Sequence, residues 1–365
     1  MKKIVVKFPS NKCRIIIGSG AFGKTGPELR KNNVPDKILL VVDKSVLNLH
    51  KEKIDSLLEL KGFSVKLHVF EPGENLKTLA GAEKIYSALQ ENKFGRDSAI
   101  IAIGGGITGD VSGFAASTYM RGIRFIQIPT TLLAAVDSSV GGKTGVNFNG
   151  FKNIIGSFYQ PELVVIDPAF FSTLPEEEII CGLAEIIKAA YLSGENFYKL
   201  VSRFAGNIIN RDFSKIEKLI YESLLLKSSV VLKDEKEAGI RKILNLGHTF
   251  AHALETASEF NVKHGQAVIF GIVCAHFLSY RMGVLNYKNF EQSLSLIDSV
   301  RRYIIIPPVE AGILYDIMER DKKNRNGKIK FIAIKNTGNV YIDFESTKDV
   351  VILAIEDALS FFLSN

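Results

Sequence analysis

Three of the six histidines lie between positions 248 and 264, and they are the side chains best placed to bind a metal. His248 and His252 are four residues apart, so they share one face of a helix. If that helix extends toward its N-terminus, Arg241 and Asn245 join the same polar stripe. Burying such a stripe is costly unless it binds something. We therefore interpret it as a binding face rather than a solvated surface.

A metal needs more ligands than one helix face supplies. His264 lies just before another predicted helix, about 16 residues after His248. Two histidines and one carboxylate make the three-ligand set of a catalytic zinc with an open position. The candidate carboxylate is Glu185, an acid in an otherwise apolar helical run, with Lys188 on the same face. The H-E-x-x-H protease motif is absent because Thr249 follows His248.

A glycine-rich turn is the second candidate site. The apolar run 99–103 predicts a fully buried strand, and 111–116 predicts the opening of a helix. Between them, Gly104, Gly106 and Gly109 have the G-x-G-x-x-G spacing of dinucleotide sites. A strand, a glycine turn and a helix N-terminus together favour an anion such as a phosphate.

An earlier cluster, Gly18, Gly20 and Gly23, repeats that spacing. The predicted strand 38–42 ends at Asp43, about 20 residues after it, where a ribose-binding acid is expected. The literal fingerprint therefore fits the first cluster with Asp43 better than it fits the second. Both clusters could serve one nucleotide.

Composition limits the classes of protein that remain. The 365 residues are 46% hydrophobic and 23% charged, which suits two folded domains. No apolar run reaches the length of a membrane span, and the first residues are not a signal peptide. The cysteines are few and scattered, which indicates a reducing, cytoplasmic location. The net charge of +7 is spread along the chain, which suits a small anionic substrate and argues against nucleic acid.

The elements that must position these residues change character near position 174. Before it, predicted strands alternate with helices, which indicates an α/β domain with a mostly parallel sheet over 1–174. Polar loops are expected at 137–147 and 151–153. The remainder, 175–365, is predicted to be mainly helical. Its predicted helices are 176–192, 213–233, 244–258, 266–282, 287–303 and 311–320, with strand-like runs at 329–334 and 340–344.

The chain resembles the dehydroquinate synthase family of sugar-phosphate cyclases over nearly its whole length. The segments that carry the resemblance are 104–110, 121–131, 137–147, 152–153, 182–188, 234–241, 245–252, 264–265 and 321–323. The resemblance implies a Rossmann-like N-terminal domain that binds NAD, a helical C-terminal domain, an active site in the cleft between them, and a homodimer.

The resemblance also assigns roles to residues. It implies that Glu185, His248 and His264 bind Zn²⁺ or Co²⁺. The implied NAD contacts are Asp43, Glu74, Lys77, Gly105, Gly106, Ile107, Thr108, Gly109, Asp110, Thr130, Thr131, Lys143, Lys152 and Thr173. The implied substrate set is Asp137, Lys143, Asn153, Lys188, Lys227, Arg241, Asn245, His252 and one lysine of the pair Lys322 and Lys323. Arg121 matches an arginine that reaches the neighbouring subunit's site.

The reaction implied by the resemblance is the second step of the shikimate pathway. 3-Deoxy-arabino-heptulosonate 7-phosphate is converted to 3-dehydroquinate and inorganic phosphate by oxidation, phosphate elimination, reduction, ring opening and an intramolecular aldol closure. Three alternatives remain: a sister cyclase whose substrate lacks the carboxylate, a metal-dependent polyol dehydrogenase, and an inactive nucleotide-binding scaffold. Arg241 and Lys227, which suit a carboxylate, favour the dehydroquinate synthase.

Overall fold

The computed structural model describes residues 1–71, 73–320 and 328–363. The chain forms two compact units, Met1–Leu174 with Ile216–Lys236, and Pro175–Lys215 with Glu237–Asn365. The predicted single division into 1–174 and 175–365 differs from this, because helix α8 (Ile216–Lys233) returns to the first unit. It packs there against strand β1 (Lys2–Lys7), with the Lys2 ammonium over the Tyr221 ring.

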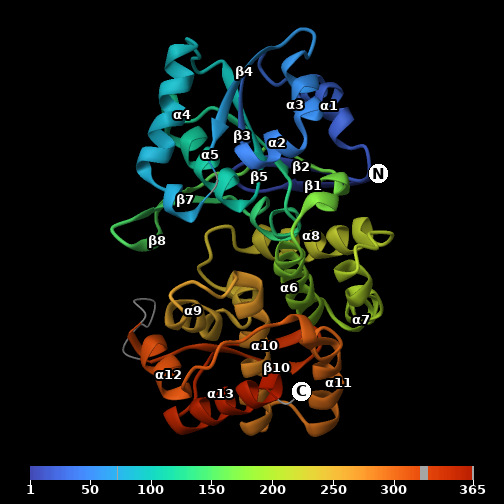
Figure 1. The fold of residues 1–365 in the computed structure, drawn as a ribbon, viewed down its shortest axis with the longest axis vertical. Helices are drawn as coiled ribbons and strands as arrows, with labels where there is room; N and C mark the ends of the chain where they lie inside the picture. Colours follow the sequence, from blue (N-terminus) through green and yellow to red (C-terminus); the bar gives the residue numbers. More distant parts are fainter. Residues whose placement is uncertain (72, 321–327, 364–365) are drawn as a thin grey trace. The chain divides into compact units, whose positions relative to one another are not determined.

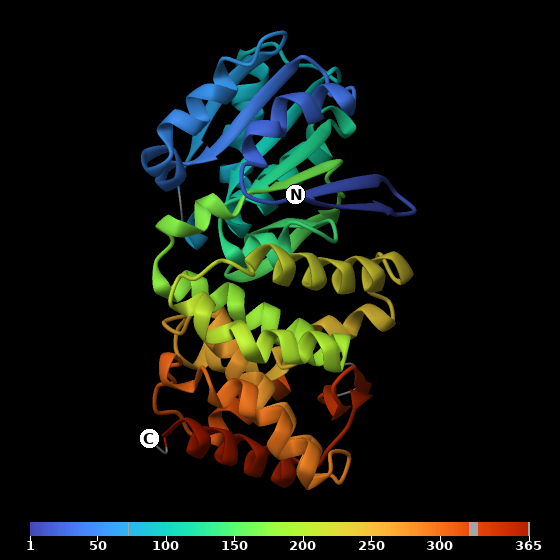
Figure 2. The same cartoon turned by 90° about the vertical axis from the view of Figure 1, so that its right-hand side faces the viewer.

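The first unit is built on a sheet in which the described strands run in the order β1-β2-β9-β6-β5-β3-β4 (Figure 1). From β2 to β4 all neighbours are parallel, and only β1 is antiparallel to its neighbour. Figure 2 shows the β1–β2 hairpin reaching beyond the other strands. The other strands are β2 (Lys12–Ile17), β3 (Lys37–Asp43), β4 (Ser64–Phe70), β5 (Ser98–Gly104), β6 (Arg124–Pro129) and β9 (Leu163–Ile166).

Helices cover the sheet, which confirms the predicted α/β class. They are α1 (Thr25–Lys31), α2 (Lys44–Leu49), α3 (Lys51–Leu58), α4 (Leu79–Glu91) and α5 (Gly106–Thr118). All residues of β5 are buried, as expected for a central parallel strand. The core between the sheet and helices α4 and α5 includes Leu39, Ile100, Ile85, Leu89 and Val111.

The sheet order shows which glycine turn lies beside Asp43. Strand β2, which precedes the first cluster, is separated from β3 by β9, β6 and β5, roughly 19 Å at the usual strand spacing. Strand β5, which precedes the second cluster, is the direct neighbour of β3. The expectation that Asp43 fits the first cluster better is therefore wrong: the spacing matched, but the two strands are not adjacent.

The segments expected to be polar loops form an antiparallel ribbon instead. Strand β7 (Lys143–Phe148) pairs with β8 (Phe151–Phe158), after a π-helical turn at Ala134–Ser138. Gly145 and Gly156 are paired, and a Cβ on Gly156 would lie 2.2 Å from the Thr144 carbonyl oxygen. These glycines allow two backbones to approach closely, whereas Gly145 was expected to lie in a loop.

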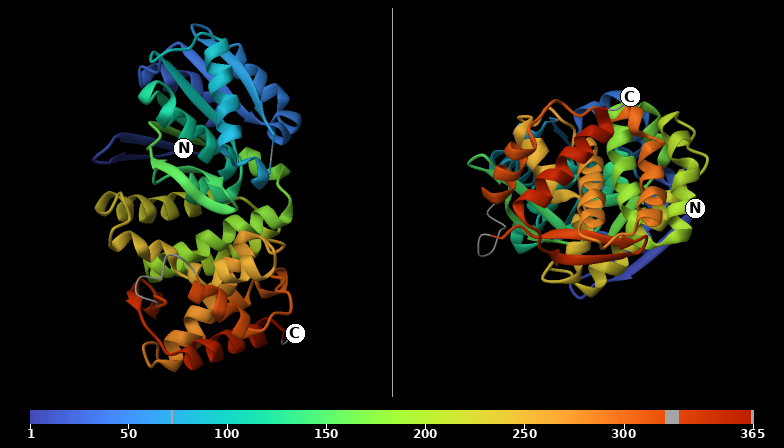
Figure 3. Two further views of the ribbon diagram at one scale, coloured as in Figure 1. Left: turned by 90° about the vertical axis from the view of Figure 1, so that its left-hand side faces the viewer. Right: turned by 90° about the horizontal axis from the view of Figure 1, so that it is seen from below.

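The second unit is mainly helical, as predicted. Its helices are α6 (Glu176–Ser193), α7 (Glu195–Ile209), α9 (His248–Ala257), α10 (His264–Arg281), α11 (Tyr287–Asp298), α12 (Ala311–Arg320) and α13 (Lys348–Leu363). Helix α10 is largely buried and contacts α6, α9 and α13 (Figure 3). The strand-like runs form the hairpin β10 (Phe331–Asn336) and β11 (Asn339–Phe344). Helices α7 and α13 were not predicted.

Candidate metal centre and nucleotide turn

The three residues predicted to bind the metal lie together in the second unit. Glu185 comes from the middle of α6, while His248 and His264 are the first residues of α9 and α10. The Glu185 Oε1 atom is 4.0 Å from His248 Nε2 and 3.7 Å from His264 Nε2. One ligand atom from each residue lies within 4.8 Å of the others.

The carboxylate of Glu185 has the surroundings of a ligand rather than of a surface acid. Glu185 is 3% exposed in a helix whose neighbouring positions are buried. Neither of its oxygens accepts a well-formed hydrogen bond from the part of the chain that the structure describes. The Lys188 ammonium, itself buried, forms an ion pair with Oε2. Oε1 is therefore turned toward the two imidazoles.

Both histidines have their other ring nitrogen close to an acceptor. His248 Nδ1 is 3.2 Å from the Leu246 carbonyl oxygen, and His264 Nδ1 is 3.5 Å from Glu255 Oε1. A proton on Nδ1 leaves the Nε2 lone pair facing Glu185, which is the usual arrangement around a bound metal. Glu255 was not predicted from the sequence to have a role. The available signal was its position seven residues after His248, two helical turns along the same face.

The protonation of the two histidines differs. Burial lowers the pKa of His248 well below its usual value, and the nearby positive charge of Lys188 lowers it further. Burial also opposes the charge on His264, but the carboxylates of Glu185 and Glu255 outweigh it and raise the pKa of His264 to about 9. Without a metal, His264 therefore holds a proton at neutral pH. A metal must displace that proton to bind.

The donor set fits a zinc-type ion. Ligand atoms about 2.0–2.2 Å from a tetrahedral zinc lie roughly 3.3–3.6 Å from one another. The distances of 3.7 and 4.0 Å from Glu185 are slightly wider, so small side-chain shifts would bring the atoms into range. Three protein ligands leave one position open for a substrate oxygen.

The polar stripe around His252 is not one helix face. The segment Ile240–Asn245 is a 3₁₀ turn, and Gly247, with φ +79, separates it from α9. This glycine packs against α10, because a Cβ there would lie 2.7 Å from the Ile272 nitrogen. His248 and His252 do share a face, with ring centroids 5.6 Å apart. Helix α9 therefore begins four residues after the start of the predicted helix 244–258, and the extension of that helix back to Arg241, on which the stripe depended, is wrong.

Arg241 and Asn245 are nevertheless held by the surrounding structure. Arg241 is buried, with 3% of its surface exposed. The Asn245 side-chain amide donates to Glu237 Oε1 at 3.0 Å, and Glu237 has a positive φ of 59. Glu237 is a second polar residue that sequence reasoning missed. Lys322 and Lys323 lie outside the described residues.

The central glycine turn in the first unit leads directly into helix α5, which begins at Gly106. A Cβ on Gly104 would lie 2.6 Å from Thr108 Oγ1, and one on Gly105 would lie 3.2 Å from the Thr131 methyl group. The Thr130 N–H donates to the Gly104 carbonyl at 2.9 Å, which fixes the turn against the end of β6. The predicted residues Ile107, Gly109 and Asp110 form the first turns of α5. The backbone N–H groups at its N-terminus can donate hydrogen bonds to a bound anion.

A polar network flanks this turn. The Lys77 ammonium donates to Asp110 Oδ2 at 2.6 Å. Burial raises the pKa of Asp110, and Lys77 opposes the rise. The Asn147 side chain donates to Glu74 Oε1 at 2.8 Å and accepts from the Asn153 N–H at 2.9 Å. Asn147, which sequence analysis did not assign a role, therefore links two predicted site residues.

The remaining predicted residues of the first unit lie on different elements. Lys227 of α8 donates to both the side chain and the carbonyl of Asp137, each at 2.6 Å. Thr173 contacts His50 Nε2 at 2.9 Å. Asp43 accepts from the Ser45 N–H at 2.8 Å and caps α2. The exposed residues include Lys143 at the start of β7, Lys152 on β8, and Arg121, which has a positive φ of 67.

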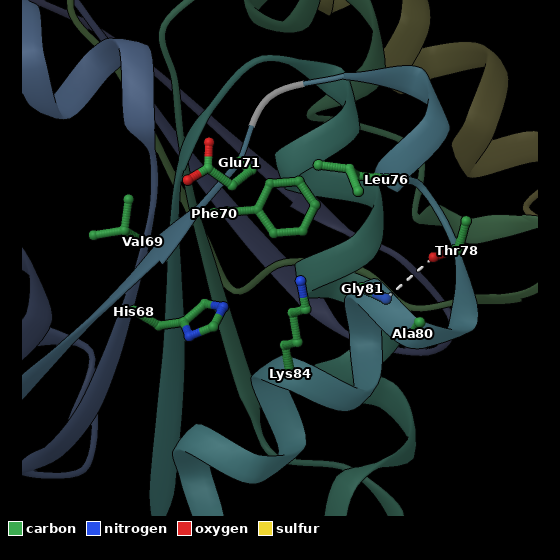
Figure 4. Close-up of a pocket in the computed structure, with 9 residues that line it drawn as sticks. All are labelled: His68, Val69, Phe70, Glu71, Leu76, Thr78, Ala80, Gly81 and Lys84. Atoms are coloured by element: carbon green, nitrogen blue, oxygen red, sulfur yellow. Dashed lines mark hydrogen bonds between the residues drawn. The ribbon is translucent and has the colours of Figure 1, made fainter.

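Two cavities are lined by other residues. One of about 80 Å³ is lined by β4 and the start of α4, where the Thr78 hydroxyl accepts from the Gly81 N–H (Figure 4). The other, of about 570 Å³, lies in the second unit and is lined by residues that include Leu254, Val262 and Pro307. Neither is lined by a residue predicted to bind metal, nucleotide or substrate.

The three cysteines are free and buried. Among the described residues, no helix combines the length and the apolar character that a membrane span requires.

The amino-acid sequence matches two family models. One, described as 3-dehydroquinate synthase N-terminal, covers residues 67–181, and the other, described as 3-dehydroquinate synthase C-terminal, covers residues 182–324. The 3-dehydroquinate synthase of Pelagibacter ubique is 41% identical over 368 residues, 98% of this chain and 99% of the relative. That of Desulforamulus reducens is 40% identical over 97% of this chain and 99% of the relative.

Solved structures of cyclases share the fold. A 2-deoxy-scyllo-inosose synthase complexed with carbaglucose-6-phosphate, NAD⁺ and Co²⁺ matches with a TM-score of 0.86 and 23% identity, over 98% of this chain and 100% of that one. The 2-epi-5-epi-valiolone synthase from Streptomyces hygroscopicus with NAD⁺ and Zn²⁺ bound matches with a TM-score of 0.82 and 22% identity, over 100% and 98%. With both family models and near full-length relatives in agreement, the chain belongs to the 3-dehydroquinate synthase family.

Proposed function

We propose that the protein is an NAD- and metal-dependent lyase that converts 3-deoxy-arabino-heptulosonate 7-phosphate to 3-dehydroquinate and inorganic phosphate. The observation that carries this proposal is that Glu185, His248 and His264 lie together, in a chain that is 41% identical to a 3-dehydroquinate synthase over almost its full length. The reaction is the second step of the shikimate pathway.

Two bound groups are part of the proposal. NAD would supply reversible hydride transfer, and Zn²⁺ or Co²⁺ would polarise substrate oxygens as a Lewis acid. The cyclase structures that share the fold contain NAD⁺ with one or other of these metals. The backbone amides at the start of α5 would hold the dinucleotide phosphates, and Asp43 at the adjacent strand end would hold a ribose.

The residues of this chain would mainly hold and orient the substrate. Lys188 and Arg241 are buried cations in the same unit as the metal ligands, and His252 lies beside His248. Lysine suits a phosphate as a point charge, whereas the planar fork of arginine suits the substrate carboxylate. Lys227 and Asp137 supply a further charged pair in the first unit. Orientation and charge stabilisation of this kind need no strong protein base.

The sister cyclase and dehydrogenase functions have weaker support. The inosose and valiolone synthases are 22–23% identical to this chain, against 41% for the dehydroquinate synthase of Pelagibacter ubique. A glycerol dehydrogenase from Schizosaccharomyces pombe has a TM-score of 0.65 and 16% identity. Arg241 and Lys227, suited to a carboxylate, favour the heptulosonate substrate.

We further propose that the protein is a cytoplasmic homodimer. Free, buried thiols suit a reducing compartment. The β7–β8 ribbon exposes large apolar side chains, with Phe148 44%, Phe151 48%, Ile154 58% and Phe158 41% exposed. Apolar side chains grouped in this way favour contact with a protein surface, and a second copy of this chain is the partner that the family resemblance favours.

The test is phosphate release from heptulosonate phosphate with limiting NAD. Phosphate should far exceed the NAD supplied while NADH absorbance stays flat, because the hydride returns to the substrate within each turnover. A chelator should stop phosphate release, and added zinc should restore it. NADH accumulating one for one with product would identify a polyol dehydrogenase, and release that is indifferent to NAD would reject the proposed chemistry.

A further inference from the structure

The imidazole of His264 lies between two carboxylates, one at each ring nitrogen. Its Nε2 is 3.7 Å from Glu185 Oε1, and its Nδ1 is 3.5 Å from Glu255 Oε1. A neutral imidazole carries one proton and one in-plane lone pair. If the proton is on Nδ1, facing Glu255, the lone pair is on Nε2, facing Glu185 and the metal position.

Glu255 is built into the fold rather than placed at the surface. It is 8% exposed, and it lies in α9 among the buried residues Phe250, Ala251, Ala253 and Leu254. A carboxylate in such surroundings is costly unless it is paired. Helix α9 therefore supplies a metal ligand at its first residue and, two turns later, an acid that faces the ligand of α10.

His248 is held in an equivalent way by a different group. Its Nδ1 faces the Leu246 carbonyl at 3.2 Å, so the backbone sets the orientation of that ring. For His264 the group that faces Nδ1 is a side chain, the carboxylate of Glu255. A carboxylate differs from a carbonyl because its charge also raises the basicity of the ligand.

We propose that Glu255 is a positioning residue for the metal centre, which holds the Nδ1–H of His264 and directs its Nε2 to the metal. The inference rests on the proposed role of Glu185, His248 and His264 as metal ligands. Removing a partner of this kind typically weakens metal binding by about 10- to 100-fold.

The experiment measures zinc affinity of the full-length, metal-stripped protein by competition with a chromogenic chelator. Glu255→Ala should weaken zinc binding by at least tenfold, whereas Glu255→Gln, which keeps an oxygen acceptor, should recover part of that loss. The matched control is Glu259→Gln, which removes the same charge from an exposed position four residues away. Its zinc affinity should equal that of the parent.

Two further readouts separate positioning from structural support. The visible spectrum of the Co²⁺-loaded Glu255→Ala protein should change, because the geometry of the His264 ligand changes, while the circular dichroism spectrum of the metal-free protein should match that of the parent. If Glu255→Ala does not fold, the same comparison is made with Glu255→Gln, which should bind zinc more weakly than Glu259→Gln.

Equal zinc affinity and equal Co²⁺ spectra in the parent and both Glu255 variants would overturn the inference. An equal loss in the Glu255 and Glu259 variants would also overturn it, because the effect would then be one of overall charge. His264→Ala tests the proposed function separately. If that variant keeps its zinc, the ligand assignment itself fails, whereas loss of zinc there with intact binding in the Glu255 variants rejects only the role of Glu255.

Discussion

Zinc affinity should depend steeply on pH near neutrality, because the metal and a proton compete for His264. With Glu185 and Glu255 on either side, the pKa of His264 is raised to about 9. The pKa of His248 is lowered, so His248 is already neutral and adds no proton to the competition. Each zinc should therefore release about one proton, and affinity should rise roughly tenfold per pH unit between about pH 7 and pH 8.

The pH range of this dependence distinguishes the arrangement from an ordinary histidine site. A histidine with the usual pKa of about 6.5 is largely neutral at pH 7, so its zinc affinity would change little above that pH. The assay is calorimetric titration of the metal-free protein with Zn²⁺ near pH 7 and pH 8, in two buffers of different ionisation enthalpy. A flat affinity and no proton release over that interval would show that His264 is not protonated in the metal-free protein.

Three further experiments test the other assignments. His264→Ala should remove bound metal while the protein stays folded, and normal zinc content by metal analysis would reject the ligand set. Arg241→Ala should raise the KM for heptulosonate phosphate roughly 10- to 100-fold, because one charge-assisted contact contributes about 1.5–3 kcal/mol. The KM for NAD should change little. An unchanged substrate KM would exclude the carboxylate role. Mixed dimers of Arg121→Ala and Lys188→Ala subunits should regain activity if Arg121 completes the partner's site, and verified heterodimers that stay inactive would argue against sharing.

The sequence was sufficient to group Glu185, His248 and His264 as a candidate metal set, and the structure places the three together, because their chemistry is local and unusual. His248 was part of a predicted polar stripe, His264 lay just before a predicted helix, and Glu185 was an acid in an apolar helix. Glu255 was not visible in this way, because acids are common in helices and its importance depends on where α10 lies. Its role requires the packing of α9 on α10, which no spacing rule encodes.

The errors in the predicted fold have related physical causes. Gly247 adopts a left-handed conformation at a close contact with α10, and a single glycine within a helical pattern does not reveal this. Gly145 was interpreted as a loop residue, although together with Gly156 it permits close strand pairing. Asp43 matched the first glycine cluster in spacing alone, while the order of the strands, which depends on long-range pairing, placed it beside the second.

The return of α8 to the first unit has a consequence for how the chain folds as it is synthesised. The unit is interrupted after Leu174, and its last segment ends at Lys236. A ribosome adding 5–20 residues per second needs roughly 3–12 s to make residues 175–236, after which the first unit is complete. Until then β1 lacks its covering helix and Asp137 lacks Lys227. The nascent N-terminal half must therefore persist for seconds in an incomplete form, with the segment Pro175–Lys215 already emerging behind it.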